Sequence, residues 1–162
     1  MFLLQRLRAD HEAAVLEFEL TNRAYFAASI NDRGDAYFAD FAKEYRTSLD
    51  DQESGAIAFH VLVDDDGEVV GRFNLYELTD STAVLGYRVA LRVAGGGVAT
   101  SAVRDLSRIA RQDHGLRTLR AATSHANVAS QRVLAKTGFV ADGPAEVGGQ
   151  PGLWYELDLA AL

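Results

Sequence analysis

The sequence has no cysteine, which excludes disulfide bonds, thiolate metal sites and a cysteine nucleophile. This composition is compatible with a reducing compartment, and we expect a cytoplasmic protein. Long apolar runs are missing too, because no stretch approaches the roughly 18 apolar residues that a membrane-spanning helix needs. The apolar start at residues 1–8 is too short for a signal peptide. We therefore expect no membrane partner.

Basic residues are fewer than acidic ones. The 16 Lys and Arg against 23 Asp and Glu give a formal net charge of −7. Binding to nucleic acid through phosphates needs clustered Lys and Arg, so this balance argues against a DNA or RNA partner and favours a basic or cationic one. With 162 residues, 48% of them hydrophobic, and no linker or repeat, we expect a single domain over residues 1–162, as a monomer or homodimer.

No group of residues has the spacing of a metal site. The four histidines are scattered along the chain, and the acidic run at residues 64–66 lacks the EF-hand spacing. The Asp66-Gly67 pair instead predicts a tight turn between two strands. We expect no bound metal.

The apolar pattern predicts a mixed fold. Strand-like runs cover residues 3–8, 56–64, 69–78, 83–89, 116–123, 139–141 and 153–159. Helical spacing marks residues 13–20, 23–26, 38–49, 98–110 and 127–136. In the first of these helices Ala13, Leu16 and Leu20 are expected to form the buried face, and residues 142–152 are expected to form a loop.

A crossover helix at residues 98–110 would make the strands on either side of it parallel. We therefore expect an α/β (α+β) fold, in which a mostly antiparallel sheet contains one central parallel pair and is flanked by helices.

A glycine run lies between a predicted strand and the crossover helix. Gly95, Gly96 and Gly97 precede the helix that starts at Val98. The first N–H groups of a helix have no intrahelical partner and lie at the positive end of its dipole, so a glycine loop placed there favours an anion such as a phosphate.

Two common phosphate loops do not fit this run. A P-loop ends in Gly-Lys-Ser or Gly-Lys-Thr, whereas Gly97 is followed by Val98 and Ala99. A dinucleotide-binding loop has a third glycine where this chain has Thr100, and it needs an acidic residue on the next strand, where residues 116–123 offer none.

The third alternative is an acyl-CoA loop. Arg92, Gly95 and Gly97, followed by Ala99, match the Arg/Gln-x-x-Gly-x-Gly/Ala pattern of the GNAT N-acetyltransferase superfamily. Residues 127–139 match the second pattern of that superfamily, Asn-x-x-Ser to Gly-Phe, in the same order and about 30 residues further on. The chain resembles this superfamily, and the branch it resembles contains the ribosomal-protein N-terminal alanine acetyltransferases.

The resemblance implies a GNAT-type fold with a splayed central strand pair, and transfer of acetyl from acetyl-CoA to a primary amine by direct attack. It assigns the cofactor pyrophosphate to backbone N–H groups of the segment from Gly95 to Thr100, with added charge from Arg92. It also implies that an N–H near Val89 stabilises the thioester oxygen. The cofactor residues it implies are Val89, Arg92, Gly95, Gly96, Gly97, Val98, Ala99, Thr100, Asn127 and Ser130.

Asn127 and Ser130 would face the pantetheine and thiol end of the cofactor. Both residues also suit a simpler role, because Asn127 is a good N-cap for the helix that follows it. The two roles do not exclude each other.

The catalytic base is where the sequence departs from the family pattern. Residues 83–85 and 121–123 carry no glutamate where some relatives have one, and Leu134 stands where some have a tyrosine. Glu146, in the expected loop, and Glu77 remain as candidate bases, and Ser130 as the candidate that protonates the thiolate.

Asn74 and Arg23 are the candidates for acceptor binding. The expected acceptor is the α-amine of a protein or peptide N-terminus, because an amine of pKa about 8 is roughly one-tenth neutral at pH 7, whereas lysine at about 10.4 is almost fully charged. The alternatives are a small amine or amino-acid-like metabolite as acceptor, or a non-catalytic acyl-CoA-binding module.

Overall fold

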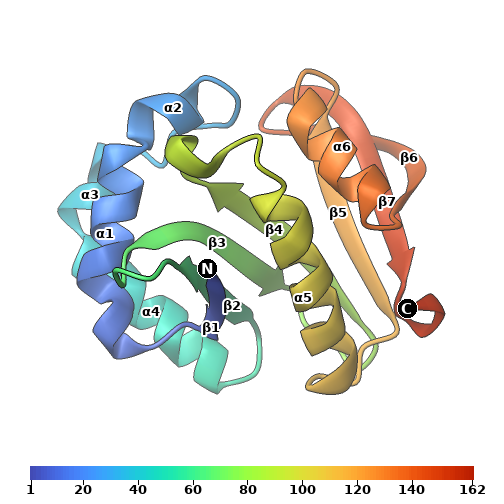
Figure 1. Cartoon of the computed structure of the whole chain (residues 1–162), viewed down its shortest axis with the longest axis horizontal. Helices are drawn as coiled ribbons and strands as arrows, with labels where there is room; N and C mark the ends of the chain where they lie inside the picture. The colour runs from blue at the N-terminus through green and yellow to red at the C-terminus, as the bar shows by residue number, and fades with distance from the viewer.

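The computed structural model describes residues 1–162 and contains a sheet with helices on both faces (Figure 1). The strands are β1 (Leu3–Arg6), β2 (Ala58–Val63), β3 (Val69–Tyr76), β4 (Thr82–Val89), β5 (Thr118–Ser124), β6 (Val140–Val147) and β7 (Gln150–Asp158). The helices are α1 (Glu12–Thr21), α2 (Arg23–Ala27), α3 (Asp35–Ala39), α4 (Phe41–Glu53), α5 (Val98–Gln112) and α6 (Val128–Lys136).

The strands form one seven-stranded sheet in the order β1-β2-β3-β4-β5-β7-β6. Every neighbouring pair is antiparallel except β4 and β5, which are parallel and are joined through α5. This confirms the predicted α/β fold, with its mostly antiparallel sheet and central parallel pair.

Two hydrophobic clusters cover the two faces of the sheet. Along β2, Phe59 and Val61 belong to the cluster that includes the buried residues of α1 and α4, while Ala58 and Leu62 belong to the cluster under α5 and α6. Successive strand residues point to opposite faces, so β2 contributes to both clusters. The helices are thereby fixed on either side of β3 and β4.

The buried face of α1 differs from the predicted one. Val15, Phe18 and Glu19 are buried and Leu16 is half-buried against the same cluster, whereas Ala13 and Leu20 are exposed. Apolar residues occur around this helix, so their spacing did not determine which side turns inward. Contacts with β3 and α4 determine it, and they bury a glutamate.

The predicted loop at residues 142–152 is wrong. β6 continues to Val147 and β7 starts at Gln150, so only a tight turn separates them. Gly152 in this segment allows the two strands to pack closely. A Cβ at this position would lie 2.2 Å from the carbonyl oxygen of Thr123, so β7 can approach β5 only with glycine there.

Candidate active site

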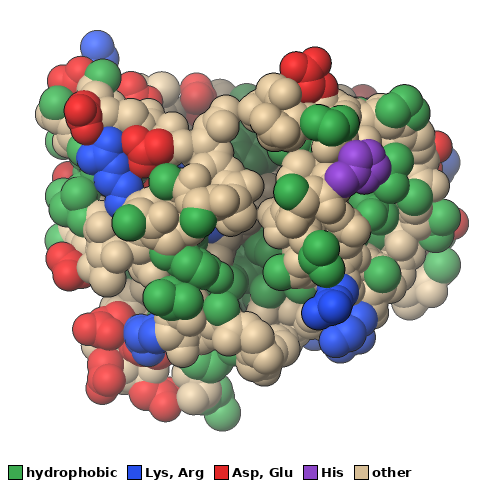
Figure 2. Space-filling view, turned by 90° about the horizontal axis from the view of Figure 1, so that it is seen from above, with side chains coloured by type: hydrophobic (Ala, Val, Ile, Leu, Met, Phe, Trp, Pro, Cys, Tyr) green, Lys and Arg blue, Asp and Glu red, His purple; other side chains and the backbone are tan.

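A hollow opens where the two parallel strands separate. Pairing covers only residues 82–84 of β4 and 118–120 of β5, and beyond these residues the strands diverge. Two cavities lie along this opening, a larger one of about 650 Å³ and a smaller one of about 320 Å³. Seen from above, the surface is hollowed between the two halves of the molecule (Figure 2).

The two cavities meet at a shared set of residues. Both are lined by Ser29, Ile30, Tyr87, Arg88, Asn127 and Ser130. These residues come from the segment after α2, from β4 and from the start of α6. We call this shared lining the junction.

The smaller cavity lies at the N-terminus of α5. Gly95 and Gly97 have positive φ angles of 80° and 78°, and Gly97 is the N-cap residue of α5 with no side-chain cap. The first N–H groups of α5 are therefore not satisfied by a cap, as an anion site requires.

Most of the predicted cofactor residues line the smaller cavity. They are Val89, Gly95, Gly97, Val98, Ala99, Thr100, Asn127 and Ser130. Gly96 lies in the same loop but does not line the cavity. The structure also brings in Arg132 and Lys136, which the sequence analysis missed. Their signal was their spacing of four residues, which places them on one side of α6.

Arg92 does not line either cavity. Its guanidinium is 2.6 Å from the Asp64 carboxylate and 3.2 Å from that of Glu68, at the turn between β2 and β3. In this arrangement two acidic side chains already neutralise the charge that the sequence analysis assigned to the cofactor.

The backbone N–H of Val89 faces the opening between the strands. Ala90 donates a hydrogen bond to the carbonyl oxygen of Val70 on β3. Bonding directions alternate along an antiparallel pair, so the N–H of Val89, one residue earlier, points away from β3. On that side β5 has already diverged, and the N–H is directed toward the smaller cavity.

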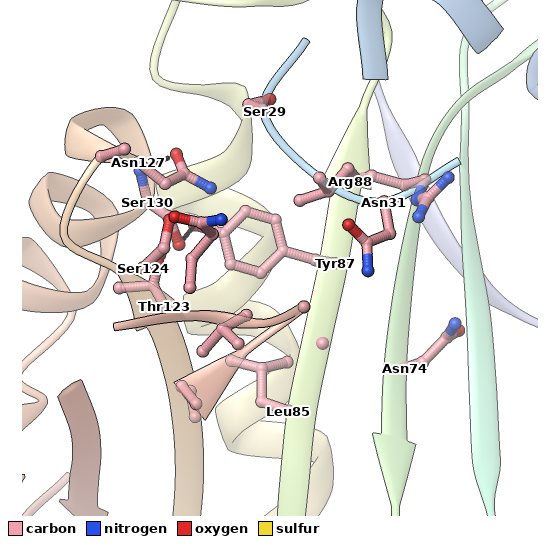
Figure 3. A pocket seen from close by; sticks show the side chains of 18 of the residues that line it. Ser29, Asn31, Asn74, Leu85, Tyr87, Arg88, Thr123, Ser124, Asn127 and Ser130 are labelled. Atoms are coloured by element: carbon pink, nitrogen blue, oxygen red, sulfur yellow. Dashed lines mark hydrogen bonds between the residues drawn. The ribbon is translucent and has the colours of Figure 1, made fainter. Parts of the chain in front are cut away.

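A hydroxyl pair occupies the junction. The Tyr87 hydroxyl donates to the Ser130 hydroxyl at 3.2 Å, and the backbone N–H of Ser130 donates to the Asn127 side-chain oxygen at 3.2 Å. Figure 3 shows the Tyr87 ring reaching from β4 toward α6. Burial raises the pKa of Tyr87, so this hydroxyl keeps its proton at neutral pH. Asn127 is therefore the predicted N-cap, and Ser130 lies in the lining of both cavities.

Asn74 lies in the wall of the larger cavity, on β3 beside β4 (Figure 3). Its side chain is buried and its amide donates to the Tyr76 hydroxyl at 3.3 Å. Its carbonyl oxygen Oδ1 has no hydrogen-bond partner. A buried oxygen of this kind is suited to accept a hydrogen bond from a ligand N–H.

Three other predicted residues lie outside both cavities. Glu77 is exposed after β3, and Glu146 is exposed on β6 opposite Pro151. Arg23 forms ion pairs with Asp32 and Asp35, each at 2.8 Å. These pairs hold the segment between α2 and α3, which itself lines the larger cavity.

Three arginines in the lining of the larger cavity surround a carboxylate that is buried behind them. Glu19 of α1 is 1% exposed. Its carboxylate is 2.6 Å from Arg33, 3.5 Å from Arg88 and 3.8 Å from Arg72. All three arginines line the cavity, whose lining contains no Asp, Glu, His or Lys.

The three guanidinium groups are not equally compensated. Burial lowers the pKa of Arg33, but the charge and hydrogen bond of Glu19 outweigh this effect and hold that pKa above its ordinary value. The pKa of Arg88 is lowered, first by burial and then by the charge of Arg33, which exceed the opposing effect of Glu19. Glu19 is thus chiefly the partner of Arg33.

The sequence matches an acetyltransferase family model, and the fold resembles that of solved acetyltransferases. Residues 2–140 match the family model described as Acetyltransferase (GNAT) domain. No curated protein matches the sequence significantly. The structure resembles a ribosomal-protein-S5-alanine acetyltransferase from Vibrio fischeri, with a TM-score of 0.89 and 18% identity over 97% of this chain and 92% of that one.

Two further structures show the same fold. RimJ from Mycobacterium smegmatis, solved in complex with CoA-disulfide, gives a TM-score of 0.86 and 23% identity over 99% of this chain and 83% of that one. A spermidine N-acetyltransferase from Vibrio cholerae, in complex with CoA and spermine, gives 0.80 and 15% identity over 98% and 96%. The similar folds thus come from proteins with different acceptors.

No three His, Asp or Glu side chains of the chain come together as a group that could hold a metal ion. Among the helices, none is at once long and apolar enough to cross a membrane.

Proposed function

This chain belongs to the acetyltransferase (GNAT) domain family and is an N-acetyltransferase. On that premise we propose that residues 1–162 act as one domain, which transfers acetyl from acetyl-CoA to the α-amine of a protein or peptide N-terminus. The observation that carries this choice of acceptor is the lining of the larger cavity, which has no carboxylate, imidazole or lysine to act as a base.

The missing base favours an amine that is already partly neutral. An α-amine of pKa about 8 is roughly one-tenth neutral at pH 7, whereas a lysine or similar amine of pKa about 10.4 is neutral in fewer than one molecule in a thousand. The arginines of the cavity lower the pKa of a bound ammonium further, because like charges disfavour the charged form. The acceptor ammonium can therefore lose its proton to water, and no side chain of the protein has to act as a base.

The smaller cavity suits acetyl-CoA, which supplies the acetyl thioester when it is bound. Uncapped N–H groups at the start of α5 are available for the pyrophosphate. Arg132 and Lys136 add positive charge on the α6 side and take the part that the sequence analysis gave to Arg92. Coenzyme A complexes of proteins with this fold support the assignment.

The chain's own groups can serve both halves of the transfer. As the amine attacks, a C–N bond forms and the C–S bond breaks. The N–H of Val89 is directed to stabilise negative charge on the carbonyl oxygen. Ser130 can pass a proton to the departing sulfur while it takes one from Tyr87, and Tyr87 in turn takes a proton from water, which has received the proton of the amine. A thiol of pKa about 8.5 hardly requires this acid.

The experiment compares acceptors that differ in one amine. A peptide with a free N-terminal alanine and no lysine is tested beside the same peptide with a blocked N-terminus and one internal lysine, together with spermidine and alanine amide. Thiol release from acetyl-CoA measures the rate, and mass spectrometry locates the acetyl group. We expect the free N-terminus to react at least about 100-fold faster than the lysine.

Two results would contradict the proposal. Acetylation of the lysine or of spermidine at a rate equal to that of the α-amine would move the acceptor class to strongly basic amines. Silence across the whole panel, with acetyl-CoA still bound, would indicate a non-catalytic acyl-CoA-binding module instead.

A further inference from the structure

We propose that the acceptor carries a carboxylate close to its reacting amine, and that Arg72 and Arg88 bind this group in the larger cavity. The inference rests on the proposed function, because it concerns the acceptor of the same site. Two sources share this chemistry: an acidic side chain near the N-terminus of a peptide, and the free α-carboxylate of a single amino acid.

The first argument is the local charge. Arg33, Arg72 and Arg88 bring three positive charges to the cavity lining, and the buried Glu19 behind them brings one negative charge, which leaves a formal surplus of two positive charges. No acidic residue lines the cavity itself. Buried charges without a partner are costly, so a cavity of this kind favours an anionic ligand and disfavours a cationic one.

The second argument is the unused hydrogen-bonding capacity. Arg72 is 5% exposed and its Nε has no hydrogen-bond partner, while its Nη1 is 3.8 Å from the Glu19 carboxylate. Arg88 lies 3.5 Å from the same carboxylate, and its other contact is the ring of Phe26, 4.7 Å below the guanidinium. Both arginines therefore retain N–H donors for the planar two-point contact that guanidinium makes with carboxylate.

The third argument is position. Arg88 follows Tyr87 on β4 and belongs to the junction, so the surplus charge lies beside the hydroxyl pair. Asn74 offers a buried oxygen without a partner on the same cavity wall. An amine donating to Asn74 and a carboxylate accepting from Arg88 are the two groups that an amino acid or an acidic N-terminus presents close together.

A purely structural role explains only part of this cluster. Arg33 and Glu19 form a close pair at 2.6 Å, which is sufficient to bury the glutamate. Two more arginines do not improve that compensation, since each adds a charge of the same sign. Their presence in the wall of an open cavity is explained by a ligand that brings the missing negative charge.

The test measures kcat/KM for acceptors that differ in the charge close to the reacting amine, with each rate expressed per neutral amine. Three peptides carry Glu, Gln or Lys at position 2 after an N-terminal alanine, and free alanine is compared with alanine amide. We expect a preference of at least about ten-fold for Glu over Gln, or for alanine over its amide, with the Lys peptide slowest. The arm that shows the preference identifies the source of the carboxylate.

Variants connect the preference to the cluster. Arg88→Gln should bring the ratio of acidic to neutral acceptor close to one, while Arg108→Gln, an exposed arginine on α5 paired with Asp105, should keep the ratio. Thermal unfolding shows whether each variant folds. If Arg88→Gln does not fold, Arg88→Lys keeps the charge but loses the two-point contact, and it should keep only part of the preference.

The outcomes separate the two proposals. Equal rates with acidic and neutral acceptors in both arms, or an unchanged ratio in the Arg88 variants, would overturn this inference and leave the proposed function intact. Absence of acetylation with every acceptor would overturn the proposed function, and the inference would fail with it.

Discussion

Two neighbouring residues on β4, Tyr87 and Arg88, contact different parts of the site. The side chains of Tyr87 and Arg88 leave the strand on opposite faces of the sheet, because strand residues alternate. Tyr87 reaches the Ser130 hydroxyl on one face, and Arg88 reaches the Glu19 carboxylate on the other. The two cavities, which we propose bind the cofactor and the acceptor, therefore meet at a single strand.

At the same scale, His60 predicts a dependence of stability on pH. It is 4% exposed on β2, and its ring nitrogen Nδ1 has no partner. Burial, together with the charge of His114, lowers its pKa to about 4 from an ordinary value of 6.5. The folded state therefore favours the neutral ring.

The sign follows from proton uptake. Between pH 6.5 and pH 4 the unfolded chain binds a proton at this histidine and the folded chain does not, so stability falls as pH falls through this window. The full difference is on the order of 3 kcal/mol. Urea unfolding at pH 7 and pH 4.5 measures it. In His60→Leu, which cannot titrate, the loss between the two pH values should be smaller by most of that amount, and an equal loss in both proteins would contradict the assignment.

At the scale of elements, the N-terminus of α5 predicts the location of the cofactor. Glu in place of Gly97 would put bulk and negative charge at the uncapped N–H groups, where we expect the pyrophosphate. Ligand at 100 times its Kd stabilises a folded protein by about 2.7 kcal/mol, which corresponds to roughly 5–10 °C in Tm for a chain of this size. Gly97→Glu should abolish this CoA-induced shift.

A matched control separates strain from binding. Gly67, in the turn between β2 and β3, also has a positive φ angle and open space around its Cα. Gly67→Glu therefore carries a similar backbone strain and the same charge away from the cavities, and it should retain the shift. A normal shift in Gly97→Glu would place the cofactor elsewhere.

Elements also show what the sequence could predict. The helix after the glycines was predictable because apolar residues repeat at helical spacing. Of Val98, Ala102, Val103, Leu106, Ile109 and Ala110, four are buried, while Val98 and Ile109 are half-buried. The N-cap at Asn127 was predictable because capping depends on local residues alone. Both sequence motifs depend on such local chemistry, and the family that they indicate is confirmed.

Features that depend on distant partners could not be predicted in this way. The hairpin of β6 and β7 contains Gly and Pro residues typical of loops, and it exists because β5 offers an edge to pair with. Glu19 is buried because arginines from three distant segments meet it. Arg92 matches a motif, yet its partners at the turn after β2 are set by the sheet.

At the scale of the whole molecule, the sign of the charge changes between surface and site. The chain carries a net charge of −7, from which the sequence analysis inferred basic or cationic partners. The larger cavity has the opposite sign, because its charged lining consists of three arginines alone. Net charge describes the average surface, whereas the acceptor responds to the groups within a few ångströms of it.

This arrangement predicts how the rate depends on pH. If no group of the protein acts as base, kcat/KM should rise about ten-fold per pH unit below the pKa of the acceptor amine and level off above it. Two peptides whose α-amines differ by about one pH unit in pKa should give midpoints that differ by the same amount, because the titrating group belongs to the acceptor. Initial rates of thiol release, measured from pH 6 to 9.5, give the dependence of kcat/KM on pH for each peptide. A midpoint that is the same for both peptides, and that disappears in Glu146→Gln or Glu77→Gln, would instead assign the base to a carboxylate that moves into the cavity when the acceptor binds.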